Sequence, residues 1–149
     1  MQGQRTGYAG SVLAAEGNAI HRRVMEHAFR ELNLPFRIVN NADAAMRAFR
    51  RERPALIFLD VMEFATPSLD GFSAARHFRR IEQRGKPGRR VAIVALTANA
   101  LAQDWRRCLE AGIDDYLAKP LTPARIAEKI ERWMPLRPVR RFVEARPHS

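Results

Sequence analysis

Short apolar runs alternate with longer amphipathic segments along the whole chain. The runs are rich in Val, Ile, Leu and Phe and occupy residues 11–15, 36–39, 55–59, 91–96 and 113–117. Continuous apolar runs of this length are typical of strands that are buried on both faces of a parallel sheet. The pattern therefore predicts five such strands.

The segment after the first run carries a helix signal. Asn18 is a good N-cap residue, and Ile20, Val24, Ala28 and Leu32 follow it at successive i+4 positions. We expect a helix that begins after Asn18 and turns these four side chains toward the core.

The other segments between runs also predict helices, each with its own start or stop signal. The expected N-caps are Asn41 or Asp43 for the second helix, Asp70 for the third and Thr122, followed by Pro123, for the fifth. The fourth is expected from about Asn99 to Glu110, with Gly112 as its stop.

Strands that alternate with helices are joined by right-handed crossovers, so neighbouring strands run parallel. The predicted fold class is α/β, a doubly wound five-stranded parallel sheet flanked by five helices. We expect an N-terminal linker over 1–10, one domain over 11–134 and a basic, proline-containing tail or linker over 135–149.

Composition adds limits to this picture. The 149 residues suit a single domain, no run approaches the ~20 apolar residues of a membrane span, and Cys108 is the only cysteine. We therefore expect a cytoplasmic domain with no membrane segment.

The net charge of +10 is concentrated in three segments. Residues 47–53 carry four Arg against one Glu, residues 84–90 carry four basic residues and no acid, and residues 134–149 carry four Arg against one Glu. Because these segments are separated along the chain, we interpret them as solvated surface and expect no specific nucleic-acid binding.

Four of the predicted strands end in polar residues, namely Glu16, Asp60, Thr97 and Lys119. In an open parallel sheet the carboxyl ends of the strands share one edge, which is where ligands bind. Two carboxylates close together favour Mg²⁺, and a hydroxyl and an ammonium group suit a phosphoryl group. The chain has no glycine-rich phosphate loop, so side chains would have to hold the phosphoryl group or carry it covalently. Asp60, at the end of the most apolar run, is the natural covalent acceptor.

The chain resembles the receiver domains of response regulators, most of all the C-terminal receivers of hybrid sensor histidine kinases. The resemblance covers residues 11–133 and is carried by VLAAEGNAIHRRV from Val12, LIFLDVM around Asp60, DGFSAARHFR from Asp70 and VALTANALAQDWRRCLEAGIDDYLAKPLTP from Val91. It implies the flavodoxin-like receiver fold.

The resemblance also implies roles for individual residues. Asp60 would be the phosphoacceptor, Thr97 the hydroxyl that bonds the phosphoryl group, Lys119 its cationic partner and Tyr116 the aromatic switch. The Lys119–Pro120 bond matches one that is commonly cis in the family.

The implied metal ligands for Mg²⁺ are Glu16, Asp60 and the backbone carbonyl of Met62, and Glu63 is a further candidate. The chain departs from the family at two places. Gly17 stands where a second acid is usual, which predicts weaker Mg²⁺ binding, and the loop 63–69 is about three residues longer than typical.

The first functional hypothesis is a receiver that takes a phosphoryl group from a histidine kinase or a histidine phosphotransfer domain. Its response surface, and a candidate homodimer interface, would be the fourth helix, fifth strand and fifth helix. The domain alone is a phosphoacceptor, either a stand-alone regulator or part of a hybrid histidine kinase.

The alternative is a degenerate receiver that works as a docking or dimerisation module without phosphorylation. A nucleic-acid-binding domain and a phosphohydrolase-like enzyme are less favoured, the latter because Met62 stands two residues after Asp60.

Overall fold

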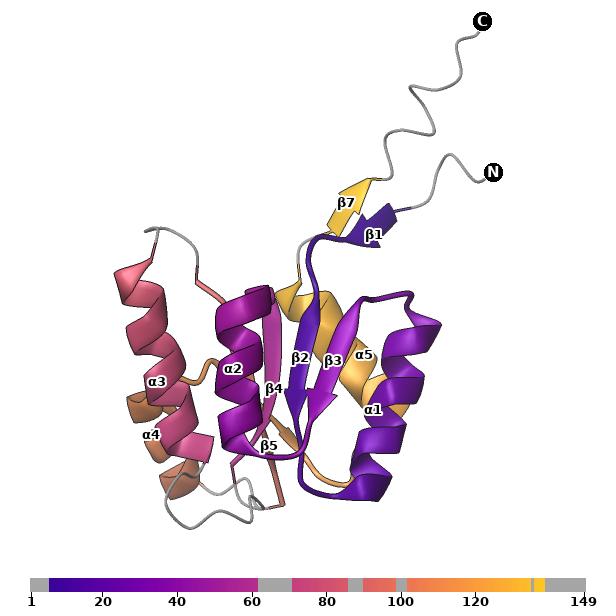
Figure 1. Ribbon diagram of the computed structural model, residues 1–149. Coiled ribbons are helices and arrows are strands. Elements are labelled where there is room, and N and C mark those ends of the chain that lie inside the picture. The colour runs from indigo at the N-terminus through magenta and orange to yellow at the C-terminus, as the bar shows by residue number, and fades with distance from the viewer. Residues whose placement is uncertain (1–5, 62–70, 86–89, 99–101, 135, 139–149) are drawn as a thin grey trace, which may run out of the picture.

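The computed structural model describes residues 6–61, 71–85, 90–98, 102–134 and 136–138. Its main sheet is parallel, with the strand order β3-β2-β4-β5-β6 (Figure 1). The strands are β2 (Val12–Ala15), β3 (Phe36–Val39), β4 (Leu56–Asp60), β5 (Ala92–Thr97) and β6 (Asp115–Ala118). The predicted sheet is confirmed, and each strand lies within two residues of its apolar run at either end.

Helices cover both faces of this sheet. They are α1 (Ala19–Glu31), α2 (Ala42–Glu52), α3 (Gly71–Arg84), α4 (Ala102–Ala111) and α5 (Pro123–Trp133). Buried side chains of α2, α3 and α4 form one core cluster with the sheet, and those of α1 and α5 form the other. Figure 1 shows α2 and α3 side by side on one face, and α1 and α5 on the opposite face.

Local hydrogen bonds explain where three helices begin. The side chain of Asn18 accepts from the backbone N–H groups of Ile20 and His21, Asn41 accepts from Ala44, and Thr122 accepts from Arg125. These predicted caps are confirmed, and of the two candidates for α2 it is Asn41 that caps. Asp70 lies outside the described residues.

The predicted inward stripe of α1 is wrong at its first position. Ile20 is 71% exposed, whereas Met25, Ala28 and Phe29 are buried. Ile20 lies in the first turn of α1, after β2 has ended at Ala15, so it does not join the cluster that α1 forms with the sheet. The helical period alone could not show where the sheet stops.

A second, two-stranded sheet lies beyond the amino ends of the main strands (Figure 1). There β1 (Thr6–Tyr8) pairs antiparallel with β7 (Leu136–Pro138). The sequence predicts neither strand, because three residues that include Gly or Pro carry no periodic signal. The segments expected as linker and tail are thus joined through β1 and β7, while the domain boundaries stay a prediction.

The described helices include none that is long and apolar enough to cross a membrane.

Candidate functional site

The polar residues that end the strands lie along the carboxyl edge of the main sheet. Asp60 is the last residue of β4 and Thr97 the last of β5, while Glu16 follows β2 and Lys119 follows β6. These four strands are consecutive neighbours in the sheet. The topology therefore brings together residues that are up to 103 positions apart.

A lysine joins the two carboxylates. Lys119 Nζ lies 3.2 Å from Asp60 Oδ2 and 3.3 Å from Glu16 Oε2. Both acidic side chains are fully buried, and that of Lys119 is 7% exposed. Charges this deeply buried are costly unless they are paired, and here two negative charges share one ammonium group.

The Glu16 carboxylate is only half satisfied. Its Oε2 accepts from the Asn18 N–H at 3.0 Å and from Lys119, and it lies 3.4 Å from His21 Nδ1. Its buried Oε1 has no hydrogen-bond partner among the described residues. Burial and the nearby Asp60 charge raise the pKa of Glu16, although the Asn18 N–H and Lys119 act in the opposite direction.

This arrangement suits a hard divalent cation. Two buried carboxylates offer oxygen ligands, Oε1 of Glu16 has no hydrogen-bond partner among the described residues, and the two acids face one lysine. No third His, Cys, Asp or Glu completes a metal-binding cluster within the part of the chain that the structure describes. Met62 and Glu63, the other predicted ligands, lie outside that part.

Gly17, which stands where the family usually has an acid, is exposed at the end of β2. Among the described glycines, positive φ is found at Gly10 and Gly112, so Gly17 does not need the left-handed region. A side chain at this position is therefore compatible with the backbone.

Thr97 contacts the neighbouring strand end, and Tyr116 contacts α4. Thr97 is 5% exposed and its carbonyl accepts from the Lys119 N–H at 2.8 Å. Tyr116 is 39% exposed, and its ring centroid lies 5.5 Å from that of Trp105 on α4. The Lys119–Pro120 bond is cis, as the resemblance implies.

Gly71 is a residue of the site that reasoning about strand ends did not find. An ideal Cβ at Gly71 would lie 2.5 Å from the carbonyl oxygen of Asp60 and 2.5 Å from Val61 Cα. Only glycine lets α3 begin this close to the backbone of Asp60. The signal in the sequence is the Asp70-Gly71 pair that precedes the helical pattern.

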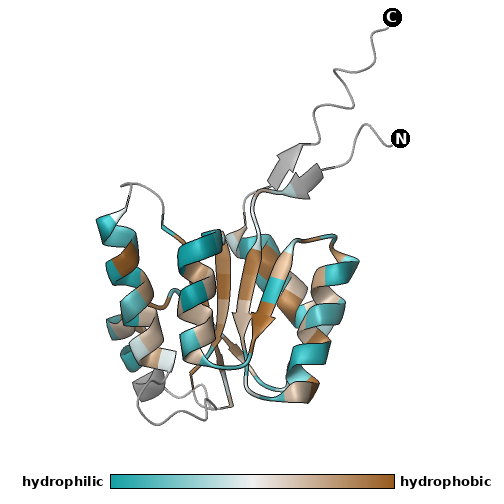
Figure 2. Ribbon diagram, in the orientation of Figure 1, coloured by the Kyte–Doolittle hydropathy of each residue, from teal (hydrophilic) through white to brown (hydrophobic). Residues whose placement is uncertain are grey.

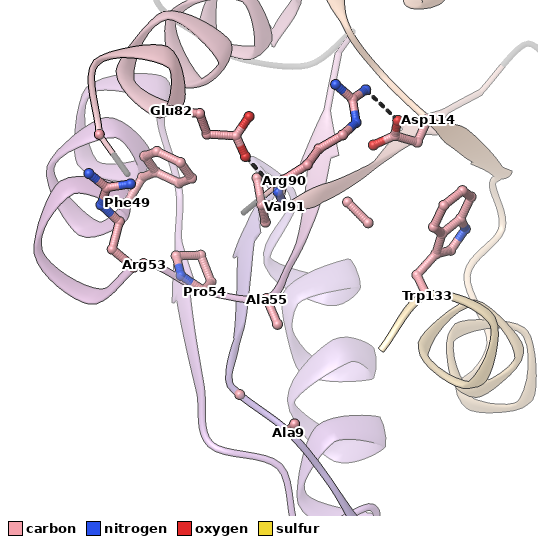
Figure 3. A pocket seen from close by; sticks show the side chains of 13 residues that line it. Ala9, Phe49, Arg53, Pro54, Ala55, Glu82, Arg90, Val91, Asp114 and Trp133 are labelled. Carbon is pink, nitrogen blue, oxygen red and sulfur yellow. Dashed lines mark hydrogen bonds and ion pairs between the residues drawn. The ribbon is translucent and has the colours of Figure 1, made fainter. Parts of the chain in front are cut away.

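A cavity of about 1020 Å³ lies away from these residues, at the amino ends of the strands (Figure 3). Arg53, Pro54, Glu82, Arg90 and Trp133 are among the residues that line it. None of Glu16, Asp60, Thr97 and Lys119 lines it, so this cavity is not the site defined by the strand ends.

Three charged groups on the wall of this cavity, Glu82, Arg90 and Asp114, are paired. Figure 3 shows Glu82 beside Val91 and Arg90 beside Asp114. Behind them, Arg79 donates to Glu82, Asp114 and the carbonyls of Val91 and Gly112. These five bonds use every donor that a guanidinium has.

The fold and the site define a class of signalling domain, and comparison with known proteins identifies it. The family model described as "Response regulator receiver domain" matches residues 12–131. This chain belongs to that family.

Individual relatives agree. The chain is 34% identical over 113 residues to the peroxide stress-activated histidine kinase mak1 of Schizosaccharomyces pombe, covering 75% of this chain and 7% of that protein. It is 30% identical to the sensor histidine kinase GacS of Pseudomonas protegens, covering 82% of this chain and 13% of that protein. The chain thus spans a small part of the curated relatives it matches.

Two solved structures are similar. The receiver domain of a Pseudomonas aeruginosa sensor histidine kinase, with magnesium coordinated in its active-site cleft, is 38% identical with a TM-score of 0.68, covering 85% of this chain and 97% of that one. The receiver domain of Ssk1 from Saccharomyces cerevisiae, crystallised with the histidine phosphotransfer protein Ypd1, is 28% identical with a TM-score of 0.76, covering 85% and 90%.

Proposed function

We propose that this domain acts in a phosphorelay, accepting a phosphoryl group on Asp60 from a phosphohistidine. The observation that carries the proposal is the buried Asp60 carboxylate at the end of a central strand, with Lys119 Nζ 3.2 Å away. A carboxylate held beside one cation at the ligand-binding edge is suited to nucleophilic attack on an anionic centre.

The proposed transfer forms a bond between an Asp60 carboxylate oxygen and phosphorus. The bond that breaks joins phosphorus to the donor's imidazole nitrogen, and that nitrogen keeps the electron pair. Lys119 pairs with the phosphoryl oxygens, and the Thr97 hydroxyl donates a hydrogen bond to them. Tyr116, packed on Trp105, is the side chain we expect to respond.

Glu16 and Asp60 would hold the Mg²⁺ that the transfer needs, with the Met62 carbonyl and Glu63 as the remaining candidates. When bound, the cation neutralises charge on the phosphoryl oxygens. Because Gly17 stands where the family usually has an acid, we expect the affinity of this site for Mg²⁺ to be lower than in a receiver with both acids.

The donor is proposed to be a histidine kinase or a histidine phosphotransfer domain, as in the complex of the Ssk1 receiver with Ypd1. Ile20 supports a protein donor, because it is 71% exposed in the helix that begins just after Glu16. A large apolar side chain beside a polar site suits burial by a docked partner.

The face formed by α4, β6 and α5 is proposed as the response surface and as a homodimer interface. Leu109 on α4 is 54% exposed and Tyr116 on β6 is 39% exposed. Sedimentation of the phosphorylated and unphosphorylated protein over a range of concentrations tests the dimer.

The central test is phosphorylation of Asp60. With Mg²⁺ and a small phosphodonor, intact-mass measurement should show one added phosphoryl group that is labile in base. Asp60→Asn should abolish it, while Asp43→Asn, an exposed carboxylate on α2, should not. If the wild type stays unlabelled with every donor, the docking-module alternative replaces this proposal.

A second test separates docking from chemistry. Ile20→Asp should slow transfer from a phosphohistidine protein but leave labelling by the small phosphodonor unchanged. Gln83→Asp, which places the same charge at an exposed position on α3, is the control. Equal slowing by both variants would contradict a docking role for Ile20.

A further inference from the structure

Helices α2 and α3 pack along a seam whose outer side is rich in arginine. Phe49 and Phe78 hold the helices together, with ring centroids 4.9 Å apart. Figure 2 shows hydrophilic stretches along both helices. Their exposed arginines are Arg47, Arg50 and Arg51 on α2 and Arg76, Arg80 and Arg84 on α3.

The centre of this surface is His77. Its Nε2 lies 3.3 Å from Arg50 Nη2, and its Nδ1 lies 3.4 Å from Arg80 Nη2. We call Arg50, His77, Arg80 and Arg84 the arginine seam.

Both ring nitrogens of His77 face arginine N–H groups, and the imidazole cannot accept a hydrogen bond from both. A guanidinium group only donates hydrogen bonds, and a neutral imidazole has a single acceptor nitrogen. Therefore only one of the two contacts can be a hydrogen bond, and in the other an N–H group faces an N–H group. An acceptor placed among these groups would remove the conflict.

No acid within the described chain neutralises the seam. The nearest carboxylates along α2 and α3 are already engaged, Glu52 with Arg37 and Glu82 with Arg79. The described arginines of the seam form no ion pair with Asp or Glu in the parts of the chain the structure covers. Positive charges gathered in this way attract anions.

We propose that the arginine seam is a binding site for a multivalent phosphate-type anion. Arg50, Arg80 and a protonated His77 would each present N–H donors to the anion, because the exposed arginine side chains on either side of the imidazole can turn toward a shared ligand. A terminal phosphate group has three strong acceptor oxygens, which matches this set better than the two oxygens of a carboxylate.

The surroundings favour a small anion over a nucleic acid or a lipid surface. The large exposed hydrophobic side chains of the described residues are Ile20, Leu109 and Tyr116, and none belongs to α2 or α3. The seam thus offers neither an exposed aromatic for base stacking nor an apolar side chain for insertion into lipid.

The proton equilibrium of His77 gives the proposal a readout. Burial and the charges of Arg80, Arg50 and Arg84 lower the pKa of His77. Among the described residues, the charged groups that act on it are these three arginines, from α2 and from α3. An anion bound among them would favour the charged imidazole, so binding should raise this pKa.

The experiment titrates the whole chain with sodium tripolyphosphate in Mg²⁺-free buffer at about 150 mM salt. The ring resonances of His77, assigned with His77→Gln, are followed by NMR across pH. We expect saturable binding and a raised His77 pKa. Arg50→Gln and Arg80→Gln should each weaken binding by about tenfold.

The control is Arg23→Gln, which removes the same charge from an exposed position on α1. It should change the affinity less than about twofold, since exposed distant charges are screened. Equal weakening by Arg23→Gln, binding that does not saturate, or an unmoved His77 pKa would each overturn the proposal. A random-sequence DNA duplex that displaces tripolyphosphate at equal phosphate concentration would also overturn it, by assigning the seam to nucleic acid.

Discussion

The two edges of the main sheet each hold a cluster of acidic and basic side chains, but the two clusters differ in their balance of charge. At the carboxyl edge, Glu16 and Asp60 share Lys119, and Glu16 Oε1 has no hydrogen-bond partner among the described residues. The cluster is buried, and its two acids share one lysine.

At the amino edge the charges are balanced. Arg79 and Arg90 face Glu82 and Asp114, which also accept from the Val91 and Ile93 N–H groups. The network joins the end of α3 to the start of β5 and to the turn before β6. Gly112 has a φ of +94°, which favours glycine, and an ideal Cβ there would lie 2.7 Å from Arg79 Cγ. Glycine at this position therefore allows the turn and leaves room for the Arg79 side chain.

The comparison teaches how to separate a stabilising cluster from a binding site. Where every buried charged atom has a partner, the cluster holds elements together. Where a buried oxygen lacks a partner among the described residues and like charges are close, the cluster is a candidate site for a ligand. Substitutions at the two edges should therefore affect different properties.

The largest effect on stability is expected from Arg79→Gln at the amino edge. It leaves two largely buried carboxylates without their shared cation, so the free energy of unfolding should fall by about 2–4 kcal/mol. Urea denaturation measures it. Labelling of Asp60 in the folded fraction should change by less than about twofold.

Arg90→Gln is the matched control, because Arg90 also pairs with Asp114 but is 59% exposed. Its cost should be below about 1 kcal/mol. If Arg79→Gln costs no more than Arg90→Gln, the amino-edge network is not what stabilises this end of the sheet.

The next effect is expected from Gly17→Asp at the carboxyl edge. A second acid adds attraction for Mg²⁺ but also repulsion with Glu16 and Asp60, so the net gain should be on the order of 1–2 kcal/mol. This corresponds to roughly tenfold tighter binding, measured by calorimetry or tryptophan fluorescence.

Gly17→Asn has a similar size without the charge and should leave the affinity near that of the wild type. A Gly17→Asp protein that folds normally but binds Mg²⁺ no more tightly would show that another group, such as Glu63, already fills that coordination position.

The smallest effect on stability is expected at Asp115. Unlike Glu16, this residue accepts hydrogen bonds at both carboxylate oxygens. Burial would raise its pKa, but hydrogen bonds from Lys129, Trp133 and the Tyr116 N–H outweigh burial and lower it. A lowered pKa in the folded state means that the stabilisation is present above the ordinary Asp pKa and is lost as the pH falls through the lowered value.

Asp115→Asn should therefore cost about 1 kcal/mol at pH 7 and progressively less toward about pH 3. Thermal unfolding of both proteins across this range, followed by tryptophan fluorescence, measures the difference. A cost that does not shrink in acid would mean that the Asp115 charge does not contribute.

The sequence by itself determined the fold and the edge of the sheet at which the candidate site residues lie. Strand composition, helical period and the caps Asn18 and Thr122 depend on neighbouring residues, so they can be read locally. Parallel topology then requires Glu16, Asp60, Thr97 and Lys119 to share one edge. Their roles in phosphoryl transfer remain a prediction that the proposed labelling tests.

Only the tertiary structure decided which side chains from distant elements meet. Arg50 and His77 are 27 residues apart, and the sequence placed the arginines of residues 47–53 in a segment of their own. The packing of α2 on α3 joins them to Arg80 and Arg84 in one basic surface. The exposure of Ile20 and the five bonds of Arg79 have the same origin. Each depends on where one element ends against another, and helix packing sets this position through side-chain contacts that no local pattern records.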